Sequence, residues 1–107
     1  MRVLLDECVP RKLRSELPGH EVRTAAEMGW DGTKNGALLR RASGDFDVLP
    51  TVDSNLEFQQ DTRSLPIIAV VLAALSNDVN VLRPMMPAVR EALAAIEPGR
   101  LYRFGPP

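Results

Sequence analysis

The sequence is poor in several residue types, and each shortage limits what the chain can be. A single cysteine, Cys8, excludes a disulfide within the chain and favours a reducing, cytoplasmic environment. The only histidine, His20, has no serine, cysteine or acid at the spacing of a catalytic triad, so we interpret it as structural. The longest apolar run, 67–75, is too short to cross a membrane, and the first residues turn acidic too early for a secretory signal. We therefore expect no membrane association.

The chain also has no excess of positive charge. Its 13 basic and 14 acidic residues give a net charge of −1, so no overall positive field indicates a nucleic-acid ligand. An RNA substrate is still compatible with this balance, because a metal-dependent enzyme carries carboxylates that cancel its basic residues in the sum. Only Lys12 and Lys34 are lysines. Arginine suits phosphate recognition, but codon bias in a GC-rich genome explains its abundance better.

The hydrophobic pattern predicts strands that alternate with helices. Strands are predicted at 2–5, 20–24, 46–52, 67–72 and 100–104, and helices at 11–17, 25–28, 37–42, 54–60 and, with a kink at Pro84 and Pro87, from Asn77 or Asp78 to Ile96. This alternation is typical of a three-layer α/β/α sandwich with a mainly parallel sheet of four to five strands. We expect one domain, 1–104, and a tail, 105–107. Pro50 removes a hydrogen bond from a central strand, so we expect a gap or bulge there, or a shorter strand.

Two aspartates, Asp6 and Asp53, each directly follow a predicted strand. In the common strand order 2-1-3-4-5, the first and third strands are neighbours, and ligands bind beyond their carboxyl ends, where the order reverses. We therefore expect the two carboxylates to lie roughly 4–6 Å apart and to need a cation between them. Mg²⁺ or Mn²⁺ would suit these oxygen ligands and could activate water against a phosphodiester. An aspartate at a strand end also often only caps the next turn, and that alternative stays open.

Three segments follow one another in a recognisable order: 3–10 (VLLDECVP), 20–30, and 46–56, which holds the pattern Thr-x-Asp-x-Asn. They resemble, in turn, the opening, the second strand with its following loop, and the third block of the small bacterial PIN-like family related to VapC-type toxins. The similarity continues to 98–102 and covers nearly the whole chain. It implies a PIN-like fold and a Mg²⁺- or Mn²⁺-dependent endoribonuclease that is the toxin of a type II toxin–antitoxin pair. RNA would be the substrate and an antitoxin the protein partner.

The resemblance also implies roles for individual residues. Asp6 and Asp53 match acidic positions of the family motif and would be the catalytic metal ligands. Glu7 and Asn55 match the residues beside them and would assist in binding the metal. Asn35 stands where the family usually has a further acid at the start of the middle helix. Asn35 offers only a neutral oxygen and would weaken a Mg²⁺ site.

The asparagine at position 35 keeps other functions open. Glu27 or Asp31 could replace the missing acid, although spacing alone does not decide this. A catalytically degenerate PIN-like module would keep the fold and bind a protein or RNA without cleaving it. A receiver-like phosphoacceptor domain would also place aspartates at strand ends, but the lysine that it needs near the end of the fourth or fifth strand is missing.

Several other side chains are candidates for contact with RNA or protein. Arg11, Lys12 and Arg14 follow Asp6 on a predicted helix and could bind RNA phosphates, although most such charge runs are solvated helix faces. Trp30 could stack on a base, but more often such a residue closes the edge of a core.

The C-terminal helical region combines an apolar stripe with a kink. The stripe, which consists of Met85, Val89, Leu93 and Ile96, is predicted to cover the sheet. The kinked segment 82–87 holds two prolines and two methionines, and we expect it to leave apolar surface that is hard to bury. This surface predicts contact with an antitoxin or a homodimer partner.

Overall fold

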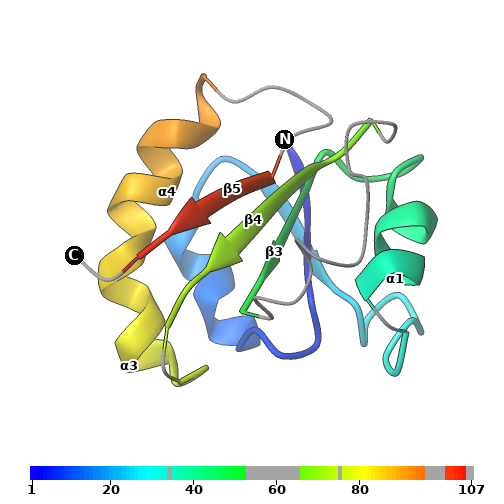
Figure 1. Cartoon of the computed structure of the whole chain (residues 1–107), viewed down its shortest axis with the longest axis horizontal. Helices are drawn as coiled ribbons and strands as arrows, with labels where there is room; N and C mark the ends of the chain where they lie inside the picture. Colours follow the sequence, from blue (N-terminus) through cyan, green and yellow to red (C-terminus); the bar gives the residue numbers. More distant parts are fainter. Residues whose placement is uncertain (34, 53–65, 75, 96–100, 106–107) are drawn as a thin grey trace.

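Five strands form one parallel sheet in the computed structural model, which describes residues 1–33, 35–52, 66–74, 76–95 and 101–105. The strands are β1 (Arg2–Leu5), β2 (Glu21–Thr24), β3 (Val48–Thr51), β4 (Ile68–Leu72) and β5 (Leu101–Phe104). All neighbouring pairs are parallel, and their order is β2-β1-β3-β4-β5 (Figure 1). The α/β class, the parallel sheet and the order that places β1 beside β3 are confirmed. The predicted helix at 54–60 lies outside the described residues.

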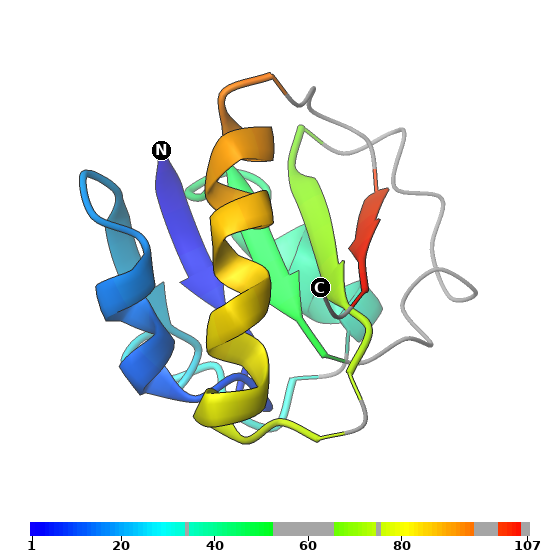
Figure 2. The same ribbon diagram turned by 90° about the vertical axis from the view of Figure 1, so that its left-hand side faces the viewer.

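Helices cover both faces of this sheet. The helix α1 (Asn35–Ala42) lies on one face; the 3₁₀ helix η1 (Arg11–Glu16), α3 (Val79–Leu82), the 3₁₀ turn η3 (Arg83–Met85) and α4 (Met86–Leu93) lie on the other (Figures 1 and 2). Alternate residues of each strand serve the two cores: Val3 and Leu5 pack with the α4 layer, whereas Leu4 packs with α1. Because both faces are covered, all of β4 is buried. None of the helices in the described ranges is long and apolar enough to cross a membrane.

The short segments that flank the strands differ from their predicted form. Residues 11–16 form a 3₁₀ helix, because Pro10 before it is extended and each turn closes over three residues, as in the bond from the Leu13 amide to the Pro10 carbonyl at 3.0 Å. Phe46 was predicted to begin a strand. It instead continues the end of α1, where its amide donates to the Ala42 carbonyl at 2.8 Å and its ring enters the α1 core. Strand β3 is correspondingly shorter than predicted.

Pro50 lies inside β3, and the pairing of this strand accommodates it. Strand β3 pairs with β4 over four positions, including Pro50 with Val70, but with β1 only at Val3 and Val48. The Pro50 carbonyl accepts a hydrogen bond from the Asp6 amide at 3.1 Å, so it faces β1. The amide and carbonyl of a strand residue point the same way, so the donor that proline lacks falls on the β1 side, where pairing is sparse.

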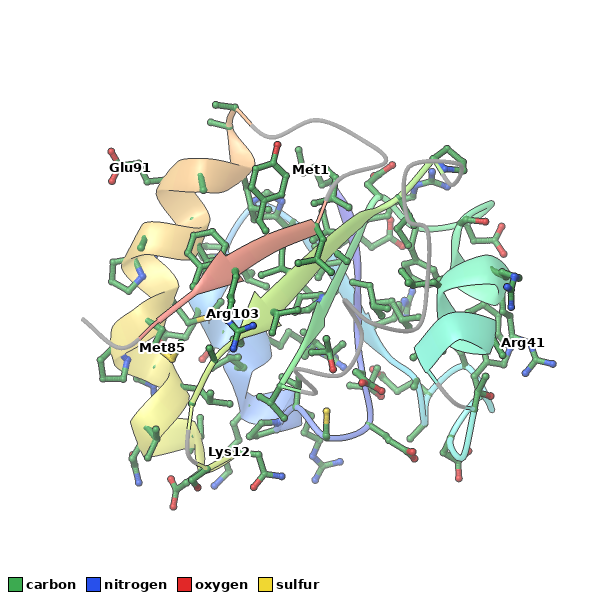
Figure 3. All side chains as sticks on the ribbon, viewed as in Figure 1. Met1, Lys12, Arg41, Met85, Glu91 and Arg103 are labelled. Atoms are coloured by element: carbon green, nitrogen blue, oxygen red, sulfur yellow. The ribbon has the colours of Figure 1, made fainter. Side chains whose placement is uncertain are left out.

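The C-terminal helices have the predicted kink but bury more than expected. Asp78 caps α3 by accepting from the Asn80 amide at 2.8 Å, and η3 interrupts the path from α3 to α4. Met85 and Met86 are only 2% and 0% exposed. Burial of Met85 agrees with its place in the predicted stripe, whereas for Met86 the expectation of apolar surface that is hard to bury is wrong; Pro84 and Pro87 are exposed. The tighter 3₁₀ turn directs both toward the sheet, as Figure 3 shows for Met85.

The apolar stripe on α4 covers the sheet as predicted. Val89 and Leu93 are buried in the same core as the inward side chains of β1 and β4, whereas Glu91 points away from the sheet in Figure 3. Ile96, the last member of the stripe, lies outside the described residues. The exposed apolar residues in the described part of this region are Val81, at 42% exposure, Pro84, Pro87, Ala88, Ala94 and Ala95.

Candidate functional site at the carboxyl end of the sheet

Asp6 lies at the point where the order of the strands reverses. It directly follows β1, which has β2 on one side and β3 on the other (Figure 1). Its amide donates to the Pro50 carbonyl of β3, and its carbonyl accepts from the Val9 amide at 2.9 Å, which closes the turn that leads to η1. The residue is only 4% exposed. The topology therefore brings a buried carboxylate to the position where open parallel sheets bind ligands.

The Asp6 side chain joins the ends of β1 and β3. Its Oδ2 accepts a hydrogen bond from the hydroxyl of Thr51 at 2.6 Å and another from the thiol of Cys8 at 3.3 Å. Its Oδ1 accepts from the amide of Glu7 at 2.8 Å. A carboxylate has roughly four acceptor positions, so one position on Oδ1 is left among the contacts that the described residues make. Sequence reasoning gave Thr51 no role, although it is the threonine of the Thr-x-Asp motif.

Cys8 is a half-buried thiol held between Asp6 and Thr51. Burial raises its pKa above the ordinary value; the Thr51 hydrogen bond opposes this rise, and the negative charge of Asp6 adds to it. The raised pKa keeps the thiol protonated, and the thiol donates to Asp6. The Cys8 carbonyl accepts from the Asn77 side chain at 3.1 Å, which fixes this turn against the segment before α3.

Glu7 is exposed beside Asp6, and it already has a partner. Its Oε2 accepts from the amide of Gly32 at 2.9 Å. Gly32 has a φ of +82°, a conformation that a residue with a side chain adopts only with strain. Glu7 thus connects the turn after β1 to the loop after β2, and its second oxygen remains the candidate metal ligand.

The other predicted metal ligands are not part of the described site. Asp53 and Asn55 lie outside the described residues, so the predicted approach of Asp53 to Asp6 stays a prediction. Asn35 begins α1, but its side chain is outside the description. Within residues 1–33, 35–52, 66–74, 76–95 and 101–105, no group of three or more His, Cys, Asp or Glu side chains is placed to hold a metal ion.

Glu27 has a structural role that makes it a poor substitute for the missing acid. It forms a capping box with Thr24: its carboxylate accepts from the Thr24 amide at 2.9 Å, and its amide donates to the Thr24 hydroxyl at 3.1 Å. The same carboxylate oxygen accepts from the guanidinium of Arg14. The Thr24 amide, ahead of Arg14, lowers the pKa of Glu27 below its ordinary value.

A cavity of about 700 Å³ opens beside Asp6, between η1 and the turn after β2. All three predicted RNA-binding residues, Arg11, Lys12 and Arg14, line it together with Asp6 and Glu7. Lys12 lies at the end of the molecule toward which β3 and β4 point (Figure 3). The sequence did not reveal this cavity, because it forms between segments that only the fold brings together.

Trp30 and His20 both have structural roles, as the sequence predicts. The Trp30 ring packs edge-on to Phe46 at 6.0 Å between centroids, and the guanidinium of Arg41 lies 5.7 Å above it. Trp30 therefore closes the edge of the α1 core. The Nδ1 atom of His20 lies 3.3 Å from the N-terminal amine of Met1. Burial and that positive charge lower the pKa of His20, which favours the neutral ring.

Comparison of this chain with protein-family models, with curated proteins and with solved structures finds no match. The function must therefore be inferred from the position of Asp6, its partners and the cavity beside it.

Proposed function

We propose that this chain is a metal-dependent endoribonuclease of the PIN-like type, with Asp6 and Asp53 as the ligands of Mg²⁺ or Mn²⁺. The observation that carries the proposal is the buried carboxylate of Asp6 at the switch point, bonded to Thr51 at the end of β3. Two residues after Thr51, the sequence supplies the second aspartate. Ligand sites of open parallel sheets form at this position from residues that follow neighbouring strands.

The chemistry of the donors fits a hard cation. Asp6 and Glu7 supply carboxylate oxygens, and both have acceptor capacity beyond the hydrogen bonds described. Mg²⁺ is usually bound by one or two carboxylates and several waters, so Asp53 would complete a sufficient set. A bound ion would lower the pKa of a water and neutralise charge on a phosphodiester. Thr51 and the Glu7 amide would orient the Asp6 carboxylate toward that ion.

A polymeric substrate suits the surroundings of Asp6. A second hollow, of about 490 Å³, is lined by Val52, Ala74, Ser76 and Asn77 and lies beyond the ends of β3 and β4. The 700 Å³ cavity lies toward β2, so the two hollows flank the end of β1. An RNA strand that crosses the strand ends would occupy both and would place an internal phosphodiester near Asp6.

A catalytically degenerate PIN-like module is the alternative, and one observation favours it. Three hydrogen bonds from within the protein already hold the Asp6 carboxylate, as they would hold an aspartate that only organises the turn between β1 and η1. Asn35, which stands where the PIN-like family usually has an acid, also favours a catalytically degenerate module. In this version the cavity and the basic residues would bind a partner without cleavage.

The role as a toxin with an antitoxin partner is part of the proposal. Of the four residues that suggested a partner at 82–87, Met85 and Met86 are buried and only Pro84 and Pro87 are exposed, which weakens the case for that segment. Co-expression with the neighbouring gene of the native operon tests the partner directly, because a stable complex should copurify. Light scattering on the isolated chain distinguishes a monomer from a homodimer.

The test of catalysis is a cleavage assay on single-stranded and structured RNA with Mg²⁺, Mn²⁺ or EDTA. We expect metal-dependent cleavage by the native chain and none by Asp6→Asn or Asp53→Asn. Asp45→Asn is the matched control, because Asp45 is exposed at the opposite end of the sheet, after α1. Equal cleavage by all forms would indicate a contaminating nuclease. Absence of cleavage and of growth arrest would favour the binding module.

A further inference from the structure

The cavity beside Asp6 is lined by apolar, basic and acidic side chains. Val9 and Pro10 come from the turn after β1, and Ala26 comes from the turn after β2. Arg11 and Lys12 are exposed at the same cavity. Its volume of about 700 Å³ lies within the range of small-molecule sites and would accept one nucleotide.

The three basic residues of this region are not equivalent. Arg14 forms an ion pair with Glu27 that connects η1 to the turn after β2, so its charge is neutralised within the wall. Arg11 and Lys12 form no ion pair with any residue in the described part of the chain. These two side chains are therefore the cations that an incoming anion would meet.

Three acidic residues, Asp6, Glu7 and Glu27, also line the cavity, and each accepts hydrogen bonds from other residues of the protein. The Asp6 carboxylate accepts from Thr51 and Cys8, and Glu7 accepts from Gly32. Because the cavity has both exposed cations and apolar side chains, a ligand with one anionic end and one flat, apolar end fits it better than a simple anion. A nucleotide has that form, because its phosphate is charged and its base has an apolar face.

We propose that this cavity binds one ribonucleotide of single-stranded RNA, with its phosphate at Arg11 and Lys12 and its base against Val9, Pro10 and Ala26. The inference rests on the proposed function in taking that nucleotide as part of the RNA substrate. A single strand is required, because the base must leave its stack to enter the cavity. Arg14 is a positioning residue that maintains the wall through Glu27.

The experiment measures binding by calorimetry or NMR titration in EDTA, where no metal-dependent cleavage can occur. The probes are a ribonucleoside 5′-monophosphate, the corresponding nucleoside and inorganic phosphate. The variants are Arg11→Ala/Lys12→Ala, which removes the two cations, and Ala26→Phe, which fills the cavity from an exposed position. Arg40→Ala is the control, because Arg40 is equally exposed but belongs to α1 on the other face. Circular dichroism establishes that each variant is folded.

We expect the nucleotide to bind more tightly than either the nucleoside or inorganic phosphate. Loss of both cations should weaken nucleotide binding about tenfold, the scale of two exposed charge contacts, and should leave nucleoside binding unchanged. Ala26→Phe should weaken nucleotide and nucleoside alike, and Arg40→Ala should change neither.

Two results would overturn the inference. One is equal binding of nucleotide and phosphate with no effect of Ala26→Phe, which would indicate surface charge alone. The other is no nucleotide binding at millimolar concentration. Because cleavage is measured separately, a chain that cleaves RNA but fails this test keeps the proposed function. A chain that passes without cleaving would be the binding module.

Discussion

The hydroxyl of Thr51 donates a hydrogen bond of 2.6 Å to Oδ2 of Asp6, and this bond joins the ends of two neighbouring strands that lie 45 residues apart in sequence. Thr51 is completely buried and Asp6 nearly so. Buried charge is tolerated only when such partners are present. The bond therefore supports both the fold at the switch point and the orientation of the proposed ligand.

Replacement of this threonine tests the contribution of the bond to stability. Thr51→Val keeps the shape of the side chain but, among the described residues, leaves Oδ2 of Asp6 with only the Cys8 thiol as donor. We expect a loss of roughly 1.5–3 kcal/mol in the free energy of unfolding, the range for hydrogen bonds to charged groups. Urea denaturation measures it. Thr51→Ser keeps the hydroxyl and is the control; equal losses in both variants would show that packing, not the hydrogen bond, matters.

A second prediction concerns the ion pairs that connect η1 to the C-terminal helices. Glu16 accepts from Arg90 at 3.2 Å and lies 3.3 Å from the side chain of Arg83, and Arg90 also donates to its backbone carbonyl at 3.0 Å. The side chains are 21–46% exposed, so solvent screens the charges. We expect Glu16→Gln to lower stability by about 1 kcal/mol at low salt and by less at high salt.

The matched control for that variant is Glu91→Gln, an exposed glutamate on α4 that points away from the sheet (Figure 3). It should change stability little at either salt concentration. A loss of stability in Glu16→Gln that is the same in low and high salt would mean that the loss does not come from the charge of the ion pairs.

A third prediction concerns stability in acid. The amide of Arg2 donates to Asp47 at 2.7 Å and, followed by the Arg2 side chain, lowers the pKa of Asp47 below its ordinary value of 3.8. Because the pKa of Asp47 is lower in the folded than in the unfolded state, its carboxylate stabilises the fold fully at any pH above the unfolded-state pKa. This stabilisation is lost as the pH falls through the folded-state pKa. Asp47→Asn should therefore reduce stability at neutral pH and flatten its decline in acid. Thermal melts from pH 2 to pH 7 (roughly the range over which carboxylates titrate) measure this, with Asp45→Asn as the control. If the thermal stability of Asp47→Asn declined in acid as steeply as that of the native chain, the proposed contribution of Asp47 would be contradicted.

How far the sequence predicts this fold depends on how local each signal is. The buried run of β4 and the strand before Asp6 are predictable, because a continuous apolar segment must be covered on both faces. The 3₁₀ form of η1 and the burial of Met86 cannot be predicted from the sequence, because each depends on which backbone hydrogen bonds form in a short segment between two prolines. Both depend on contacts with the rest of the fold.

In the candidate site, too, some residues are predictable from local sequence and others depend on the fold. Asp6 was predictable from its place after a strand, and Thr51 could have been found from the Thr-x-Asp motif. The pairing of Arg14 with Glu27 was not predictable, because it joins η1 to a turn that follows a different strand. That pairing separates Arg14 from Arg11 and Lys12, which the sequence presents as one basic group.

The last prediction separates the two aspartates by their effect on stability without metal. In Asp6→Asn, the amide group must replace an oxygen that accepts from both Thr51 and Cys8, or else the one that accepts from the Glu7 amide. At the Oδ1 position the amide nitrogen would face the Glu7 N–H, which can only donate; at the Oδ2 position the Thr51 hydroxyl must turn round to accept, and the bonds to a charged group are lost. We therefore expect a loss of roughly 1–3 kcal/mol in the free energy of unfolding, the scale of a lost hydrogen bond to a charged or buried group. Asp53→Asn should instead hold or raise stability if the two carboxylates repel each other, because it removes one of two like charges.

Urea denaturation of both variants in EDTA and in Mg²⁺ tests this difference. In the native chain, Mg²⁺ should raise stability because it binds only the folded site, and both variants should lose that gain. Asp45→Asn should keep it. An equal loss of stability in EDTA from both aspartate variants would contradict repulsion between the carboxylates and, with it, the shared metal site. A native-like Mg²⁺ response in Asp53→Asn would show that the ion binds elsewhere.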